Sequence, residues 1–217
     1  MKKLSLLATM ILLLNAAHAQ FISDAGTNRP LYQIPADIQG SPFLNNNWSD
    51  GNIVSENGVN YTKMRLKFDV FRNELVFNIN DSAFRFNDPI KEFVLSLPGN
   101  KTGGTAKFIK SSLIHSKLPG EFVQELVNGK IALYKHYKKN VVEVASYNLA
   151  SNKVFEDRLT FYILKNGEAE LVTLSKKTLQ EVVADKWAQV DAYMQQNNLS
   201  SKNESGWTAA ITYYNSL

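Results

Sequence analysis

The sequence predicts a mainly β protein, with antiparallel sheet(s) of roughly 8–11 strands followed by two or three C-terminal α-helices packed on them. Apolar and polar residues alternate with a period of two after Gly51. Asn-Gly pairs at 57–58, 128–129 and 166–167 mark hairpin turns. After Ser175 the apolar spacing becomes helical. Hairpins alone do not fix strand order, so a curved sheet, a sandwich and a partly closed barrel all remain open.

The first nineteen residues have the pattern of a secretory signal peptide. Lys2 and Lys3 supply a positive start, and residues 4–14 form an apolar run too short to span a bilayer. Residues 17–19, Ala-His-Ala, form a small-x-small cleavage site. The sequence therefore predicts signal peptide 1–19, cleavage between Ala19 and Gln20, and a periplasmic or secreted protein.

Composition narrows the class of protein. Residues 20–217 suit one domain, and the absence of cysteine excludes disulfides, thiolate metal sites and an N-terminal lipid anchor. The formal charge of +4 includes Lys2 and Lys3, so the mature chain is close to neutral, which argues against nucleic acid as a partner. No apolar stretch after the leader approaches the ~20 residues of a membrane helix, so we expect no transmembrane segment.

Residues 20–51 form an irregular lead-in. They contain Pro30, Pro35 and Pro42 and the run 45–47 of asparagines. We expect one short strand near residues 31–34 and an anchoring role for Trp48 at the end of the segment.

An antiparallel β domain is expected over 52–174. Met64, Leu66, Phe68 and Val70 share one face, and the charged residues between them share the other. A two-residue turn at Arg72-Asn73 predicts three apolar cross-strand pairs: Val70–Leu75, Phe68–Phe77 and Leu66–Ile79.

Two further hairpins follow from the later Asn-Gly pairs. Around 166–167, Tyr162 should face Leu171 and Phe161 should face Val172, and both faces are apolar enough to need cover. Around 128–129, the predicted pairs are Leu126–Ile131 and Gln124–Leu133. Segments 84–86, 93–97 and 107–109 are further expected strands.

A helical segment packed on the β domain is expected over 175–217. Its first apolar stripe consists of Val183, Trp187, Val190 and Met194. Residues 201–204, Ser-Lys-Asn-Glu, match a capping box, and a second stripe follows at Trp207, Ala210, Ile211 and Tyr214. We expect these helices to cover one face of the preceding hairpin.

The sequence assigns no catalytic, cofactor-binding or metal-binding residue. Only His115 and His136 remain after removal of the leader, and two histidines without cysteine disfavour zinc. No Gly-x-Ser-x-Gly or Ser-x-x-Lys motif occurs, although a dispersed triad using either histidine stays open. Gly99 and Gly104 have phosphate-loop spacing but lack the following lysine, which favours an inter-strand loop.

Residues 134–139 are the densest basic and aromatic stretch, with the sequence Tyr-Lys-His-Tyr-Lys-Lys. One interpretation is a contact for an anionic partner such as a lipopolysaccharide, a polysaccharide or a nucleic acid. The favoured interpretation is a solvated strand end whose lysines discourage edge pairing. The glutamates near the hairpins are expected to be surface charges: Glu121, Glu125, Glu168 and Glu170.

Short motifs along the mature chain form a recognisable set. They are Gly40–Leu44, Trp48, Gly51, Asn57-Gly58, Tyr61, 69–71, 73–75, 91–93, 175–177, Asp185-Lys186, Tyr193, 197–199 and 213–215. In these motifs the chain resembles a broad, uncharacterised family of exported proteins of Gram-negative bacteria with no established activity. The resemblance implies a bacterial source and a β-rich envelope protein with a helical tail, and it transfers no catalytic residue.

These observations lead to an expected function with two alternatives. The first expectation is a soluble periplasmic protein, a non-enzymatic interaction or accessory module of the cell envelope, which needs no cofactor and binds an envelope protein, lipid or glycan. The alternatives are a small-molecule or lipid carrier with a cavity inside the curved sheet, and a hydrolase of envelope polymers using dispersed carboxylates. An apolar cavity would favour the carrier, and two facing carboxylates would favour the hydrolase. A filled core would favour the interaction module.

Overall fold

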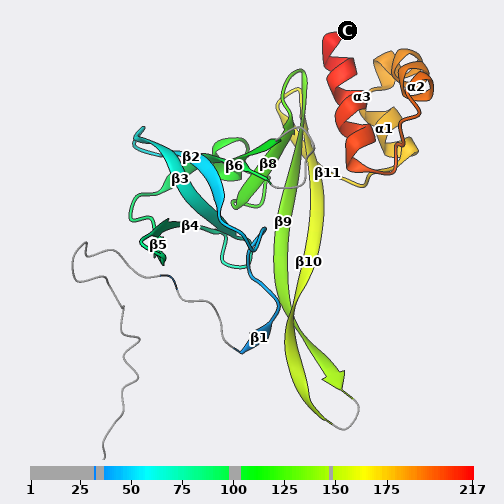
Figure 1. Ribbon diagram of the computed structural model, residues 1–217. Helices are drawn as coiled ribbons and strands as arrows, with labels where there is room; N and C mark the ends of the chain where they lie inside the picture. Colours follow the sequence, from blue (N-terminus) through cyan, green and yellow to red (C-terminus); the bar gives the residue numbers. More distant parts are fainter. Residues whose placement is uncertain (1–31, 33–36, 98–103, 147–148) are drawn as a thin grey trace, which may run out of the picture.

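The computed structural model describes residues 32, 37–97, 104–146 and 149–217, and it confirms a mainly β fold with C-terminal helices (Figure 1). One eleven-stranded sheet has the order β1-β10-β9-β8-β7-β6-β2-β3-β4-β5, and β11 also pairs with β10. The strands are β1 (Ile38–Gln39), β2 (Ser49–Ser55), β3 (Asn60–Asp69), β4 (Glu74–Ile79), β5 (Ser82–Arg85), β6 (Ile90–Ser96), β7 (Thr105–Lys110), β8 (Phe122–Val127), β9 (Ile131–Ser146), β10 (Leu149–Lys165) and β11 (Glu168–Val172).

The sheet is antiparallel except where β1 joins it. β1 pairs in parallel with Lys153 and Val154 of β10, so the lead-in contributes a strand at residues 38–39. The strand expected near 31–34 lies outside the described residues, apart from Tyr32. Trp48 packs beside Phe43 and the Lys67 ammonium lies 4.9 Å from its ring centre, consistent with an anchor at the end of the lead-in.

The part of the sheet from β3 to β8 is strongly curled. β3 and β8 are separated by three strands, which in a flat sheet would place them about 19 Å apart. The rings of Phe68 on β3 and Phe122 on β8 nevertheless lie 6.0 Å apart, and Phe93 and Phe108 fill the space around them. The curl therefore encloses an aromatic core, while the sheet as a whole stays open.

The β3–β4 hairpin keeps the predicted face but not the predicted register. Phe68 pairs with Leu75, and Leu66 pairs with Phe77, two residues away from the prediction. The turn is longer because residues 70–73 are held elsewhere. The Val70 amide donates to Pro42, and the buried Asp69 carboxylate accepts from the Arg72 amide. An even slip leaves the inward-facing set unchanged, which is why the core prediction still held.

The two later hairpins differ in outcome. At β10–β11 the predicted pairs Tyr162–Leu171 and Phe161–Val172 are confirmed, with Asn166 and Gly167 both at positive φ. At β8–β9 the predicted pairs are wrong, because a bulge leads to the pairs Val127–Leu133 and Glu125–Tyr134. The backbone of Ile131 is bonded instead by the side-chain amide of Asn215, which donates to its carbonyl at 2.8 Å and accepts from its amide at 2.9 Å.

Three α-helices follow the sheet: α1 (Lys176–Val182), α2 (Trp187–Gln196) and α3 (Glu204–Ser216). The 3-10 turn η2 (Ala184–Lys186) lies between α1 and α2, and the 3-10 turn η1 (Ser111–Leu113) lies between β7 and β8. The second stripe is confirmed as core. Trp207 and Ile211 are fully buried and pack with Ile163 and Val172, so the helices cover one face of the β10–β11 hairpin. The opposite face is covered only in part: Tyr162 and Leu164 pack near Ile114, whereas Leu171 is 65% exposed.

The capping-box prediction is wrong in its capping residue. Asn203, not Ser201, caps α3, since its side chain accepts from the Gly206 amide at 2.9 Å. Ser201 instead offers its carbonyl oxygen to the Trp207 indole N–H at 2.8 Å. The helix therefore starts two residues later than a cap at Ser201 would require.

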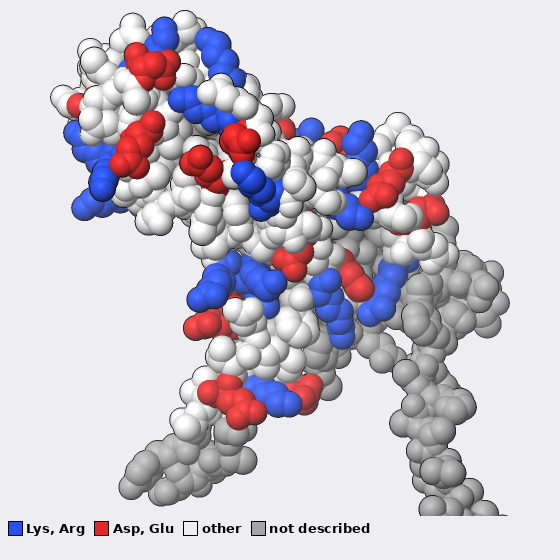
Figure 2. Space-filling view, turned by 180° about the vertical axis from the view of Figure 1, so that it is seen from behind, with Lys and Arg blue, Asp and Glu red and all other residues white. Residues whose placement is uncertain are grey.

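The β9–β10 hairpin extends well beyond the sheet (Figure 1). β8 pairs with β9 only up to His136. We call residues 137–146 and 149–160 the arm. Lys and Arg alternate with Asp and Glu over the face shown in Figure 2, on the arm as on the body. Within the described residues, no helix combines the length and apolar character needed to cross a bilayer.

Candidate ligand-binding pocket

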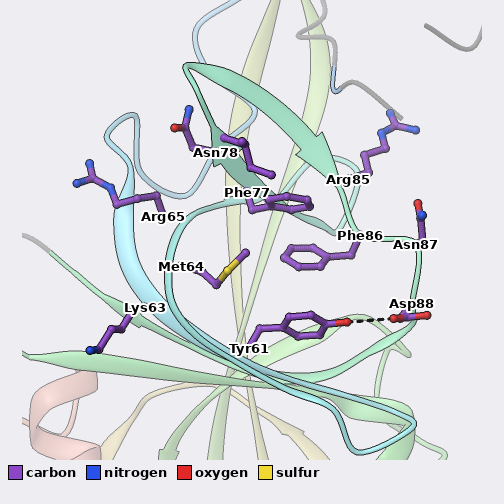
Figure 3. A pocket seen from close by; sticks show the side chains of 11 residues that line it. Tyr61, Lys63, Met64, Arg65, Phe77, Asn78, Arg85, Phe86, Asn87 and Asp88 are labelled. Carbon is purple, nitrogen blue, oxygen red and sulfur yellow. Dashed lines mark hydrogen bonds between the residues drawn. The ribbon is translucent and has the colours of Figure 1, made fainter. Parts of the chain in front are cut away.

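A pocket of about 390 Å³ opens at one end of the curled sheet, between the start of β3, the end of β4 and the β5–β6 connection (Figure 3). It adjoins the aromatic core, against which several of its side chains pack. Its lining residues are Tyr61, Lys63, Met64, Arg65, Phe77, Asn78, Ile79, Arg85, Phe86, Asn87 and Asp88.

Aromatic rings and a thioether form the floor of the pocket. The rings of Phe77 and Phe86 lie 4.5 Å apart, and those of Tyr61 and Phe86 lie 6.1 Å apart. Figure 3 shows the Met64 side chain pointing toward these rings. Phe77 is almost fully buried, whereas Tyr61, Met64 and Phe86 are half-buried and so present apolar surface to a ligand. Such a floor suits a flat or aliphatic group.

A β-bulge in β3 creates this floor. Residues three apart on a regular strand point to opposite faces, yet Tyr61 and Met64 both line the pocket. The bulge lies between them, and Lys63 within it has φ +55° and donates its amide to the Asn52 side chain at 3.1 Å. Bulges that re-aim side chains recur beside functional sites.

Three cations surround the mouth of the pocket. The Arg65 guanidinium lies 3.7 Å from Asp50, and that of Arg85 lies 3.3 Å from Glu74. Lys63 has no ion-pair partner among the described residues. The charged ends of all three point away from the floor in Figure 3, so they form a rim that can turn toward an anionic group on a ligand.

Polar groups also line the pocket. On one wall the Tyr61 hydroxyl donates to the Asp88 carboxylate at 3.1 Å, with the Asn87 amide on the same side, whereas the Asn78 amide lies on the opposite side near Arg65 (Figure 3). A smaller cavity of about 250 Å³ adjoins this wall and also touches Glu74 and Asp88. Each of these carboxylates has its own partner, Arg85 or Tyr61, and this arrangement supports binding better than acid–base chemistry.

The two histidines considered as triad members lie outside the pocket. His136 is buried on β9, with Nε2 2.6 Å from a Glu121 carboxylate oxygen and Nδ1 3.4 Å from the Thr160 hydroxyl on β10. Burial lowers the pKa of His136 despite the carboxylate beside it, which favours the neutral ring. These contacts tie three neighbouring segments of the sheet together. The ring Nδ1 of His115 accepts from the Lys117 amide in the loop before β8.

The structure divides residues 134–139 between two environments. Residues up to His136 pair with β8 on one side and β10 on the other, in the interior of the sheet, whereas residues 137–139 pair with β10 alone among the described strands. Each lysine already has a carboxylate partner: Lys135–Glu204 at 2.7 Å, Lys138–Glu121 at 3.3 Å and Lys139–Asp157 at 2.7 Å. An anionic partner would have to displace these internal pairs.

The remaining sequence candidates are also placed. Glu125 and Glu168 form ion pairs with Lys107 and Lys117, and Glu170 is exposed. Gly99 lies outside the described residues. In the part of the chain that the structure describes, no group of three or more His, Asp or Glu side chains is placed to hold a metal ion.

Sequence reasoning missed the pocket. One signal was available: Tyr61 falls in phase with the charged face of β3, although an aromatic residue belongs on the apolar face. That phase break marks the bulge. Comparison of the chain with protein-family models, with curated proteins and with solved structures found no match, so the site is interpreted from its own chemistry.

Proposed function

We propose that the protein is an exported, non-enzymatic binding module of the bacterial cell envelope, and that the pocket beside β3 is its ligand site. The observation that carries the proposal is an aromatic floor and a rim of three cations within one pocket of about 390 Å³. This combination favours a small amphipathic anion, with an acyl or aromatic group on the floor and a negative group at the rim.

The export part of the proposal rests on the leader sequence, with its lysine pair, short apolar run and small-x-small site at 17–19. The near-neutral mature chain and the mixed surface charge in Figure 2 favour a small ligand or a protein over nucleic acid.

The pocket favours this function over the two alternatives. A small-molecule or lipid carrier of the kind considered above would enclose its ligand in an apolar cavity inside the curled sheet, but the rings of Phe93 and Phe108 stack there at 4.8 Å with Phe68 and Phe122 beside them. A hydrolase would need two carboxylates facing one substrate, whereas Glu74 and Asp88 are each engaged by another side chain.

The test is a titration of mature protein 20–217 with decanoate, in which binding is measured by calorimetry and by changes in amide chemical shifts. Decyltrimethylammonium, which has the same chain and the opposite charge, serves as the control probe. We expect saturable binding of decanoate, with shifts centred on the ends of β3 and β4, and weaker binding of the cation. Binding of neither probe, or stronger binding of the cation, would contradict the proposal.

Two matched variant pairs locate the site. Phe86→Ala should weaken decanoate binding about tenfold, equivalent to about 1.4 kcal/mol, through lost aromatic contact. Phe71→Ala, at an exposed phenylalanine outside the pocket, should leave it unchanged. Lys63→Glu should weaken decanoate binding, while Lys91→Glu, at an exposed position on β6, should not. Equal effects within either pair would place the site elsewhere.

A further inference from the structure

We propose that the arm is a homodimerisation element, in which the free edge of β9 pairs antiparallel with the same edge of a second copy across a two-fold axis at Val141. This interface is separate from the pocket and does not depend on the ligand proposed for it. The partner is a second copy of this chain, because the edge is complementary to itself in length and in charge.

The first observation is a long unpaired strand edge. Beyond His136, β9 pairs with β10 alone among the described strands. Its register with β10 runs without a shift from Ile131 to Val144, and the segment contains neither proline nor glycine. An uninterrupted edge of this kind presents backbone donors and acceptors to another strand. The lysines that could blunt it, Lys138 and Lys139, are already paired with Glu121 and Asp157.

The second observation is that, among the described residues, the arm has little cover: β1 pairs with β10 at Lys153 and Val154 only. Beyond this pairing the arm is a two-stranded hairpin, which is marginally stable in water and needs further strands or packing. Phe155 contacts Phe71, with ring centres 5.2 Å apart, near the body. Farther from it, Val144 is 47% exposed, and Leu159, which pairs with Tyr137 at the base of the arm, is 50% exposed. A second copy of the ribbon would give a four-stranded sheet and supply neighbours to the apolar side chains of β9.

The available length narrows the register. Among the described residues the edge is free from residue 137 to residue 146, so its midpoint lies between Val141 and Val142, and a two-fold axis at Val141 fits this length. With the two-fold axis there, residue 145 of one copy lies opposite residue 137 of the other, so the partner strand ends where β8 begins its pairing with β9. Glu121 lies beside Lys138 at the inner end of this edge, so residues 139–143 form the centre of the pairing.

Charge selects the same register. With Val141 opposite its own copy, Lys139 lies opposite Glu143 of the second copy, and symmetry repeats the pair. Glu143 is exposed and has no ion pair within the described residues. Moving the axis by one residue in either direction would place Lys139 opposite Ala145 or Val141 and lose both pairs. In the register with the axis at Val141, Lys139 is shared between Asp157 of its own chain and Glu143 of the second copy.

Cysteine cross-linking tests the register directly, because the natural chain contains no cysteine. Paired Cα atoms in an antiparallel ladder are about 4.5–5.5 Å apart, which is within disulfide reach. Val141→Cys should therefore form a disulfide-linked dimer under mild oxidation. Leu113→Cys, on the exposed turn η1, should form no disulfide-linked dimer. A folded Val141→Cys protein that fails to cross-link would overturn the proposal.

A charge swap tests the partner. Lys139→Glu alone and Glu143→Lys alone each place like charges opposite one another twice, so each should shift the wild-type dimer to monomer in light scattering. An equimolar mixture of the two variants restores opposite charges at both positions and should recover a heterodimer. Circular dichroism checks that each variant is folded.

The two proposals fail separately. Phe86→Ala should lose decanoate binding and keep the dimer, whereas Glu143→Lys should lose the dimer and keep decanoate binding. A wild-type protein that stays monomeric at its highest attainable concentration would overturn the arm proposal and leave the pocket untouched.

Discussion

The two ends of the β9–β10 hairpin are built from similar strand sequence but have opposite surroundings. At the inner end, Ile131, Leu133 and Ile163 are buried beneath the helices. In the outer part, which is the arm, Leu159 at the base and Val144 farther out are half-exposed, and β9 has no neighbour other than β10 among the described strands. Apolar alternation along a strand thus specifies a ribbon, while the elements around it decide whether it becomes core or interface.

The sharpest way to break this comparison is to remove the helices. Deleting residues 176–217 removes the helices that bury the inner end and leaves its apolar residues exposed to solvent. We expect this deletion to abolish stable folding. Trp207 alone accounts for ~150–250 Å² of burial, or about 4–6 kcal/mol at ~25 cal/mol per Å². This is comparable to the whole net stability of a domain. Circular dichroism and thermal unfolding give the measurement. A soluble, cooperatively unfolding 20–175 fragment would show the prediction to be wrong.

A smaller change separates the helices from the sheet at one point. Asn215 bonds both backbone groups of Ile131, so Asn215→Leu leaves a donor and an acceptor without their partner. We expect destabilisation of about 1–3 kcal/mol in urea unfolding. Gln196→Leu, at an exposed position on α2, is the matched control and should change the stability by less than about 0.5 kcal/mol. Equal effects of the two variants would argue against a stabilising role for the hydrogen bonds between Asn215 and Ile131.

Acidification acts at the junction between the two ends, where His136 is buried. Burial lowers the pKa of His136 below its ordinary value of about 6.5. Below pH 6.5 the unfolded chain therefore takes up a proton that the folded chain resists. The stability contribution is complete above pH 6.5 and is lost as the pH falls through the lower folded value.

We therefore expect the melting temperature of wild type to fall between about pH 7 and pH 5, and His136→Gln to flatten that fall. His115→Gln, at a less buried histidine, should retain the wild-type profile. A profile that is equally steep in His136→Gln would assign the pH dependence to other groups.

The smallest effect is expected in the arm. Replacing Val144 and Leu159 with threonine removes apolar surface that is already half-exposed, so the stability of the monomer should change by no more than about 0.5 kcal/mol. Urea unfolding at low protein concentration is the measurement. A loss of several kcal/mol would show that the arm is part of the folded core and that the contrast between the two ends is false.

The sequence predicted the core residues of β3 and the buried apolar stripe of α3 because both depend on local periodicity. Leu66, Phe68, Trp207 and Ile211 are buried as predicted. The β10–β11 register was also predictable, since a tight Asn-Gly turn fixes the pairing beside it. The β3–β4 and β8–β9 registers were not, because Asp69 and Asn215 bind backbone at or beside the turns from positions that local patterns do not encode.

The sequence by itself determined a mainly β chain, its inward-facing residues and its helical end, since periods of two and 3.6 are properties of neighbouring residues. Only the tertiary structure decided the pocket, the curl and the free arm. The pocket needs a bulge at Lys63 to bring Tyr61 and Met64 onto one face, and the curl needs contact between strands three strands apart in the sheet. Such contacts join distant segments, and their geometry follows from packing of the whole sheet.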